Sequence, residues 1–139
     1  IYELCDRITA TYPTAVLLVT GDATGHYRSA LAVGNINYYT VIKEKLRLSD
    51  NQLKVPGVNP ALSDSRVLCN SILQNFNFIV DESCKYLIED LKYVEVNDKG
   101  EVDKTKDKHR SHLSDCLRYL LSTFHGKLIN IVFTEDDGE

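Results

Sequence analysis

The stretch Ala15-Val16-Leu17-Leu18-Val19-Thr20-Gly21-Asp22-Ala23-Thr24-Gly25 decides the expected fold. Its first six residues form a continuous apolar run rich in β-branched side chains, which is typical of a central strand covered on both faces. The run ends in a turn of small residues that carries Asp22. Because ligands bind at the carboxyl ends of strands in open α/β sheets, Asp22 is either a binding residue or a residue that caps the turn.

The segments around this run predict a mixed order of strands and helices. Further expected strands are residues 28–34, 36–42, 76–80 and 93–96, with a weaker one at 52–58 because that segment holds Pro56 and Gly57. Apolar side chains at helical spacing predict helices over residues 1–12, 61–74, 84–91 and 113–124. This order favours an α/β or α+β fold, with one mixed sheet flanked by helices.

Length and charge limit the possible classes of protein. The chain has 139 residues, which predicts one domain, and no apolar run approaches the roughly 20 residues that span a bilayer. It begins with Ile1 and contains no methionine, so we expect a fragment of a longer protein. Its net charge of −4 argues against a domain that coats nucleic acid, although an acidic pocket could still hold cations.

The cysteines predict a reduced, intracellular protein. Cys5, Cys69, Cys84 and Cys116 show neither C-x-x-C spacing nor a histidine at zinc-finger spacing. We therefore expect reduced thiols that serve as small core residues.

Asp81 and Glu82 form a second acidic candidate, at the end of the expected strand 76–80. Neighbouring strands lie about 4.8 Å apart, so Asp81 could lie near Asp22. Carboxylates gathered in this way repel one another, and Mg²⁺ or Mn²⁺ usually compensates them. The alternative is an acidic residue that begins a helix after a strand.

His112 and Asp115 are a third candidate because residues three apart share one face of a helix. Such a pair suits a hard divalent cation or proton transfer. Asp115 points almost opposite the leucine stripe of this helix, so a solvated polar face is the alternative.

Basic residues gather in the loop of residues 98–110, at Lys99, Lys104, Lys106, Lys108, His109 and Arg110. They could contact phosphate groups, but acidic residues alternate with them, so a solvated loop is the alternative. The glycine-rich motifs for nucleoside triphosphates and dinucleotides are absent.

Together these stretches resemble the nuclease domain of the large terminase subunits of tailed bacteriophages. The matching stretches, in the family's order, are GDATGHYRSALAVGNINYYTVIKEKL, VPGVNPALSDSR, FIVDESCKYLIEDLKYVEV and DKHRSHLSDCLRYLL. The most specific piece is His-x-x-Asp-x-x-x-Tyr at His112, Asp115 and Tyr119. The resemblance covers roughly residues 16–124.

This resemblance implies a ribonuclease H-like fold and an endonuclease that cleaves concatemeric viral double-stranded DNA with two Mg²⁺ or Mn²⁺ ions during genome packaging. It implies that Asp22 and Asp115 are metal ligands and that His112 is an auxiliary ligand or proton-transfer group. The middle ligand is Asp81, which its charge favours, or Asn59 with Asp64 nearby.

The resemblance also implies partners and a location. Arg28 and the loop residues Lys104, Lys106, Lys108 and Arg110 would guide the DNA backbone. Residues 1–139 would be a single nuclease domain with an acidic tail at 135–139, placed after an ATPase motor domain in a longer chain. Portal and small terminase proteins would be partners in the host cytoplasm. The alternatives are a non-catalytic module that docks on DNA or the portal, and another ribonuclease H-like resolvase or recombinase.

Overall fold

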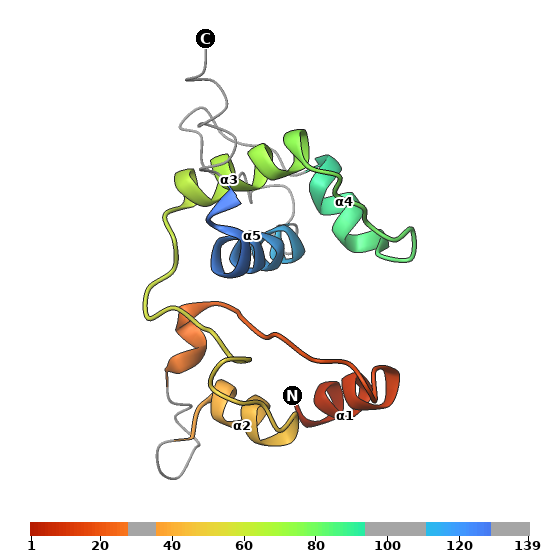
Figure 1. Cartoon of the computed structure of the whole chain (residues 1–139), viewed down its shortest axis with the longest axis vertical. Coiled ribbons are helices and arrows are strands. Elements are labelled where there is room, and N and C mark those ends of the chain that lie inside the picture. Colours follow the sequence, from red (N-terminus) through yellow and green to blue (C-terminus); the bar gives the residue numbers. More distant parts are fainter. Residues whose placement is uncertain (28–35, 94–110, 129–139) are drawn as a thin grey trace. The chain divides into compact units, whose positions relative to one another are not determined.

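The structure, a computed structural model, describes residues 1–27, 36–93 and 111–128. The chain divides into two compact units, Ile1–Asn59 and Pro60–Glu139. The first unit contains α1 (Tyr2–Thr11), the short 3-10 helix η1 (Ala23–His26) and α2 (Tyr38–Lys45), and the second contains α3 (Leu62–Asn75), α4 (Lys85–Tyr93) and α5 (His112–His125) (Figure 1).

The predicted α/β, ribonuclease H-like mixed sheet is wrong, because the described residues form helices and contain no strand. The apolar run makes a single isolated parallel bridge, between Val19 and Leu53. Val19 N donates to Gln52 O at 2.7 Å, and Lys54 N donates to Val19 O at 2.9 Å. One such pair is not a ladder, so the run stays an extended segment.

The bridge at Val19 does not extend to Leu17, because a side chain takes the place of a backbone partner there. The carbonyl of Leu17 accepts a hydrogen bond from the side chain of Gln52 (Nε2 to O, 3.1 Å), where a sheet would supply a backbone N–H. Val16 and Leu18 are 83% and 58% exposed, so the run is not covered on both faces.

The expected strand 36–42 is also wrong, because Asn37 begins a helix there. Its side-chain oxygen accepts hydrogen bonds from Tyr39 N (2.9 Å) and Thr40 N (3.0 Å), and Thr40 Oγ1 accepts one from Asn37 N (2.9 Å). This reciprocal capping box satisfies the first amides of α2. It outweighs the β-branched and aromatic residues that suggested a strand.

The other expected strands also fail or cannot be compared. Within 52–58 the bridge at Leu53 is the one pairing in the described residues, and residues 76–80 follow α3 without a strand partner, with Ile79 80% exposed. Tyr93 ends α4, which contradicts a strand that begins there. The expected strand 28–34 and residues 94–96 lie outside the described residues.

The four helices predicted from apolar spacing are confirmed as α1, α3, α4 and α5. In the second unit α3 packs against α5 and α4 packs against α5. The buried core lies where leucine faces meet, and comprises Leu68, Cys69, Ile72, Leu117 and Leu121, with Phe76, Phe78, Leu87 and Leu128 packed against it. Buried side chains of the first unit are Cys5, Tyr39 and Leu48.

Cysteine burial follows the prediction only in part. Cys5 and Cys69 are buried free thiols, as predicted, whereas Cys84 and Cys116 are exposed free thiols. Among the described helices, none combines the length and apolar character needed to cross a bilayer.

Candidate functional site

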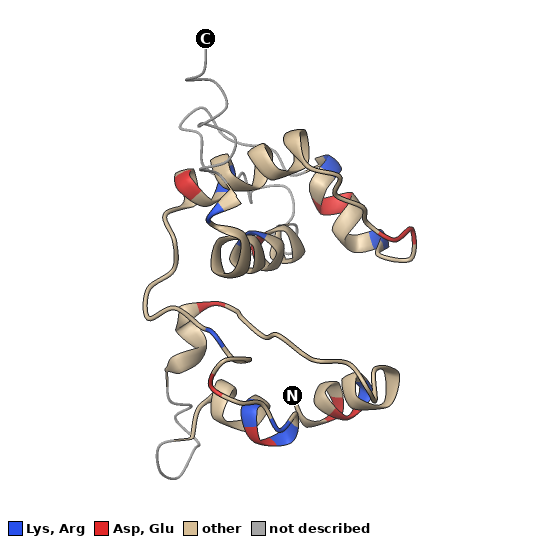
Figure 2. Ribbon diagram, viewed as in Figure 1, with Lys and Arg blue, Asp and Glu red and all other residues tan. Residues whose placement is uncertain are grey.

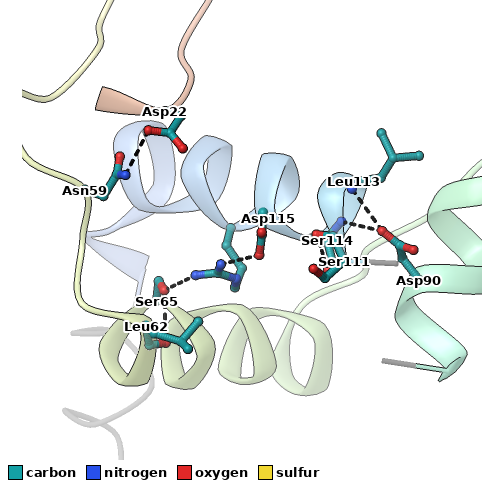
Figure 3. A network of polar contacts seen from close by, with 10 residues as sticks. Asp22, Asn59, Leu62, Ser65, Asp90, Ser111, Leu113, Ser114 and Asp115 are labelled. Atoms are coloured by element: carbon teal, nitrogen blue, oxygen red, sulfur yellow. Dashed lines mark hydrogen bonds and ion pairs between the residues drawn. The ribbon is translucent and has the colours of Figure 1, made fainter. Parts of the chain in front are cut away.

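Asp22 lies at the N-terminus of η1 and is fixed by two N–H donors. Its Oδ1 accepts a hydrogen bond from Thr24 N at 2.7 Å. It also accepts one from Asn59 Nδ2 at 2.9 Å (Figure 3). The first bond is the capping contact that the sequence offered as one alternative. The second joins the glycine-flanked turn to a residue 37 positions later in the chain.

The amide of Asn59 has a defined orientation because it makes two different hydrogen bonds. Its Oδ1 accepts from Ala23 N at 2.7 Å, and a backbone N–H can only donate, so Nδ2 must face Asp22. Asn59 therefore presents a donor, rather than a ligand oxygen, to the carboxylate. This arrangement suits a residue that orients Asp22.

Tyr39 also holds this turn, and the sequence analysis missed it. Its hydroxyl donates to Asp22 O at 2.6 Å, and its ring lies 5.1 Å from the ring of His26. A Cβ at Gly21 would lie 2.4 Å from the Tyr39 hydroxyl oxygen, and one at Gly25 would lie 2.5 Å from a ring carbon. The two glycines therefore make room for a buried tyrosine, a role that no local motif reveals.

Asp115 lies in the first turn of α5 and forms an ion pair with Arg118. Arg118 Nη1 donates to Ser65 Oγ at 2.6 Å, so the network connects α5 with α3 inside the second unit (Figure 3). His112, the first residue of α5, is exposed.

Asp90 is a second residue that sequence reasoning missed. Its Oδ2 accepts hydrogen bonds from Leu113 N (2.9 Å) and Ser114 N (3.2 Å), so a carboxylate of α4 caps α5. Asp90 is only 7% exposed, and Ser111 before the helix makes no side-chain capping bond. The contact spans 23 positions in the chain, so local capping patterns do not reveal it.

The other acidic candidates of the second unit are exposed and engaged locally. Asp81 Oδ1 accepts from Ser83 N at 2.9 Å, and hydrogen bonds from the side chain and backbone of Ser83 lower the pKa of Asp81. Asp64 Oδ1 accepts from Ser63 Oγ at 3.0 Å. Glu82 is exposed in the turn before α4. Asp64, Asp81 and Glu82 therefore lie at the surface, and Asp64 and Asp81 bond to residues close to them in the chain.

Charges on α2 are mixed in sign (Figure 2). Lys43 pairs with Asp50, and this hydrogen bond and the positive charge lower the pKa of Asp50. Lys45 lies 5.0 Å from the centre of the Tyr2 ring. The residues predicted to guide DNA, which are Arg28, Lys104, Lys106, Lys108 and Arg110, lie outside the described residues.

The possible metal ligands among the described residues can be compared with the coordination that a divalent cation requires. Mg²⁺ and Mn²⁺ prefer several oxygen ligands, but the described parts of the chain contain no group of three or more His, Cys, Asp or Glu side chains that could hold a metal ion. Asp22 offers a single oriented carboxylate, and the charge of Asp115 is compensated by Arg118. The described residues therefore do not by themselves form the two-ion centre that the resemblance implies.

No protein-family model matches the chain, and searches of curated proteins and of solved structures found no significant match. The resemblance to terminase nucleases thus stays a prediction that depends on the sequence motifs.

Proposed function

We propose that this chain is a metal-dependent endonuclease domain that cuts concatemeric double-stranded viral DNA during genome packaging. The observation that carries the proposal is the contact between Asp22 and Asn59. It joins the Gly21–Gly25 turn to the Val-Asn-Pro stretch, two separate motifs on which the terminase resemblance depends. The motif order along the chain supports the same function.

Asp22 is the residue on which the proposed activity depends most directly. Two N–H donors, Thr24 N and Asn59 Nδ2, hold its Oδ1 in one orientation. An oriented carboxylate is a suitable ligand for Mg²⁺ or Mn²⁺, and its hydrogen-bond partners hold it in place. Asn59 is then a positioning residue, and His112 and Asp115 carry the second motif of the resemblance on α5.

The proposal includes partners that follow from the resemblance. They are double-stranded DNA, an ATPase motor domain in the same full-length chain, and the portal and small terminase proteins in the host cytoplasm. Two Mg²⁺ or Mn²⁺ ions are the proposed cofactors.

Plasmid nicking in Mn²⁺ tests the proposal with matched variants. We expect the wild type to nick supercoiled plasmid and Asp22→Asn to lose at least about 100-fold in rate, since a ligand should matter more than its hydrogen-bond partners. Asp22→Asn keeps an oxygen that can accept from Thr24 N, so the turn stays capped while the charge is removed. Asn59→Ala should lose about 10- to 100-fold. Asp6→Ala, at an exposed acidic residue of α1, is the control that should retain activity.

Three results would contradict this function. Equal cleavage by the wild type and Asp22→Asn would exclude the proposed role of Asp22. No cleavage by the wild type would favour a non-catalytic docking module. A strong preference for four-way junctions over linear duplex would favour a resolvase.

A further inference from the structure

A buried cation lies where α3 packs against α5. Arg118 is 9% exposed and Ser65 is 2% exposed. The two ends of the guanidinium have different partners, because Nη1 donates to Ser65 Oγ at 2.6 Å and Nη2 donates to Asp115 Oδ1 (Figure 3). Arg118 therefore connects the two helices through one planar group.

Ser65 accepts a hydrogen bond from the Arg118 guanidinium and so fixes its orientation. Its hydroxyl donates to the carbonyl of Leu62 at 3.1 Å, so its oxygen is left to accept from Arg118. The ring of Tyr119 lies 5.7 Å from Arg118 Cζ. These contacts fix the side chain on the Asp115 side of the helix.

Because Arg118 is buried, Asp115 is needed as its counter-ion. A buried guanidinium needs a counter-ion, because an unpaired charge away from water is strongly unfavourable. Among the described residues, Asp115 supplies the carboxylate that Arg118 contacts. Its side chain is 22% exposed, so the pair lies at the edge of the core and water can still reach the carboxylate.

We infer that Arg118 is the resident cation of Asp115 and that this ion pair, anchored by Ser65, keeps a divalent cation off Asp115. An ion on this carboxylate would lie close to the guanidinium, and a separation of roughly 5 Å gives the scale of the Coulomb repulsion. Repulsion between a divalent and a monovalent cation at that separation weakens binding by roughly tenfold or more, even at the dielectric constant of bulk water. The choice of a divalent cation rests on the proposed function. A metal ion can then bind Asp115 only after the ion pair with Arg118 has opened.

Mn²⁺ binding to the full chain tests the inference without a cleavage assay. Free Mn²⁺ is followed by electron paramagnetic resonance, and all variants carry Asp22→Ala so that Asp22 does not contribute. Arg118→Gln should bind Mn²⁺ at least about tenfold more tightly than its parent. The gain should disappear when Asp115→Asn is added. Arg118→Lys retains a positive charge and should bind as weakly as the parent.

A milder variant covers the case in which Arg118→Gln does not fold. Ser65→Ala removes the anchor and leaves both charges in place, so it should give a smaller gain of the same sign, again dependent on Asp115. Thermal unfolding followed by circular dichroism establishes which variants are folded. Unchanged or weaker Mn²⁺ binding in the folded variants would overturn the inference.

The two proposals fail in different experiments. If the nuclease function is wrong, the wild type does not nick plasmid or does so independently of Asp22, yet the Arg118-dependent difference in Mn²⁺ binding persists. If the ion-pair inference is wrong, that difference is absent whether or not the wild type cleaves DNA.

Discussion

Tyr39 determines which residues the turn at Asp22 can contain. Its hydroxyl donates to the carbonyl of Asp22, and its ring occupies the space that side chains at Gly21 and Gly25 would need. Glycines beside an acidic residue can allow a ligand to approach the backbone closely, whereas in the structure a tyrosine lies there. Glycine and tyrosine therefore act together to shape the candidate site.

Gly25→Ala should destabilise the first unit by about 1–3 kcal/mol, because its methyl group would overpack against Tyr39. At Gly25 the added Cβ would lie 2.5 Å from a ring carbon of a buried side chain, which has little room to move. The free energy of unfolding in urea measures the effect. Gly57→Ala is the matched control, since nothing lies within 4 Å of a Cβ there. Equal unfolding free energies for both variants would contradict the role assigned to Tyr39.

At the scale of the elements, the helices α1, α3, α4 and α5 could be predicted, whereas α2 was expected to be a strand and the described residues contain no strand. The leucines of α5 repeat at helical spacing within one segment, so the sequence alone contains the necessary information. A strand requires a partner elsewhere in the chain, and Val19 finds one only at Leu53 in the described residues. The start of α2 depends on the side-chain contacts of Asn37 and Thr40, which local strand propensity does not include.

The residues of the candidate site also differ in whether local sequence patterns indicate them or distant contacts determine them. The turn singles out Asp22 as a candidate, and the resemblance gives Asn59 as an alternative middle ligand, whereas in the structure Asn59 donates a hydrogen bond to Asp22. Tyr39 and Asp90 could not be recognised from the sequence, because each acts through a contact with a distant segment. The ion pair of Asp115 with Arg118 has ordinary helical spacing, but its burial depends on the packing of α3.

Asp90→Ala should lower the free energy of unfolding by about 1–2 kcal/mol, since α5 would lose the acceptor for two of its first amides. The loss of a negative charge at the positive end of the helix dipole adds to this effect. Urea denaturation followed by circular dichroism gives the value. Glu89→Ala, at the exposed neighbouring position of α4, should change it by less than about 0.5 kcal/mol. A similar value for both variants would exclude the cap.

At the scale of the whole molecule, the chain has two compact units, and each contains one buried cysteine. Cys5 is 2% exposed in the first unit and Cys69 is 6% exposed in the second. Cys84 and Cys116 are exposed thiols of the second unit. The four cysteines can therefore report on the two units separately.

Pulsed alkylation in increasing urea should label Cys84 and Cys116 at once, and Cys5 and Cys69 at two different urea concentrations. Peptide mass spectrometry identifies each labelled thiol. Coincident labelling of Cys5 and Cys69 would instead mean that the two units unfold as one.

The second unit should also lose stability at alkaline pH through Cys69. Burial raises the pKa of Cys69 above its ordinary value of 9.0, although the positive charge of Arg118 opposes the shift. As pH rises past 9.0 the unfolded chain releases this proton first, so the folded state becomes less favoured. The urea midpoint of the second unit, followed by circular dichroism, should fall above pH 9, and Cys69→Ser should reduce this dependence. A midpoint that rises with pH would contradict this assignment.

The exposed extended run before Asp22 has a consequence for the behaviour of the protein at high concentration. Val16 and Leu18 are largely exposed, and the backbone beside them lacks the regular pairing of a sheet in the described residues. Apolar segments of this kind can pair with the same segment of another molecule and begin aggregation. Light scattering of concentrated solutions should therefore decrease in Val16→Lys, because a lysine within such a run opposes edge-to-edge association.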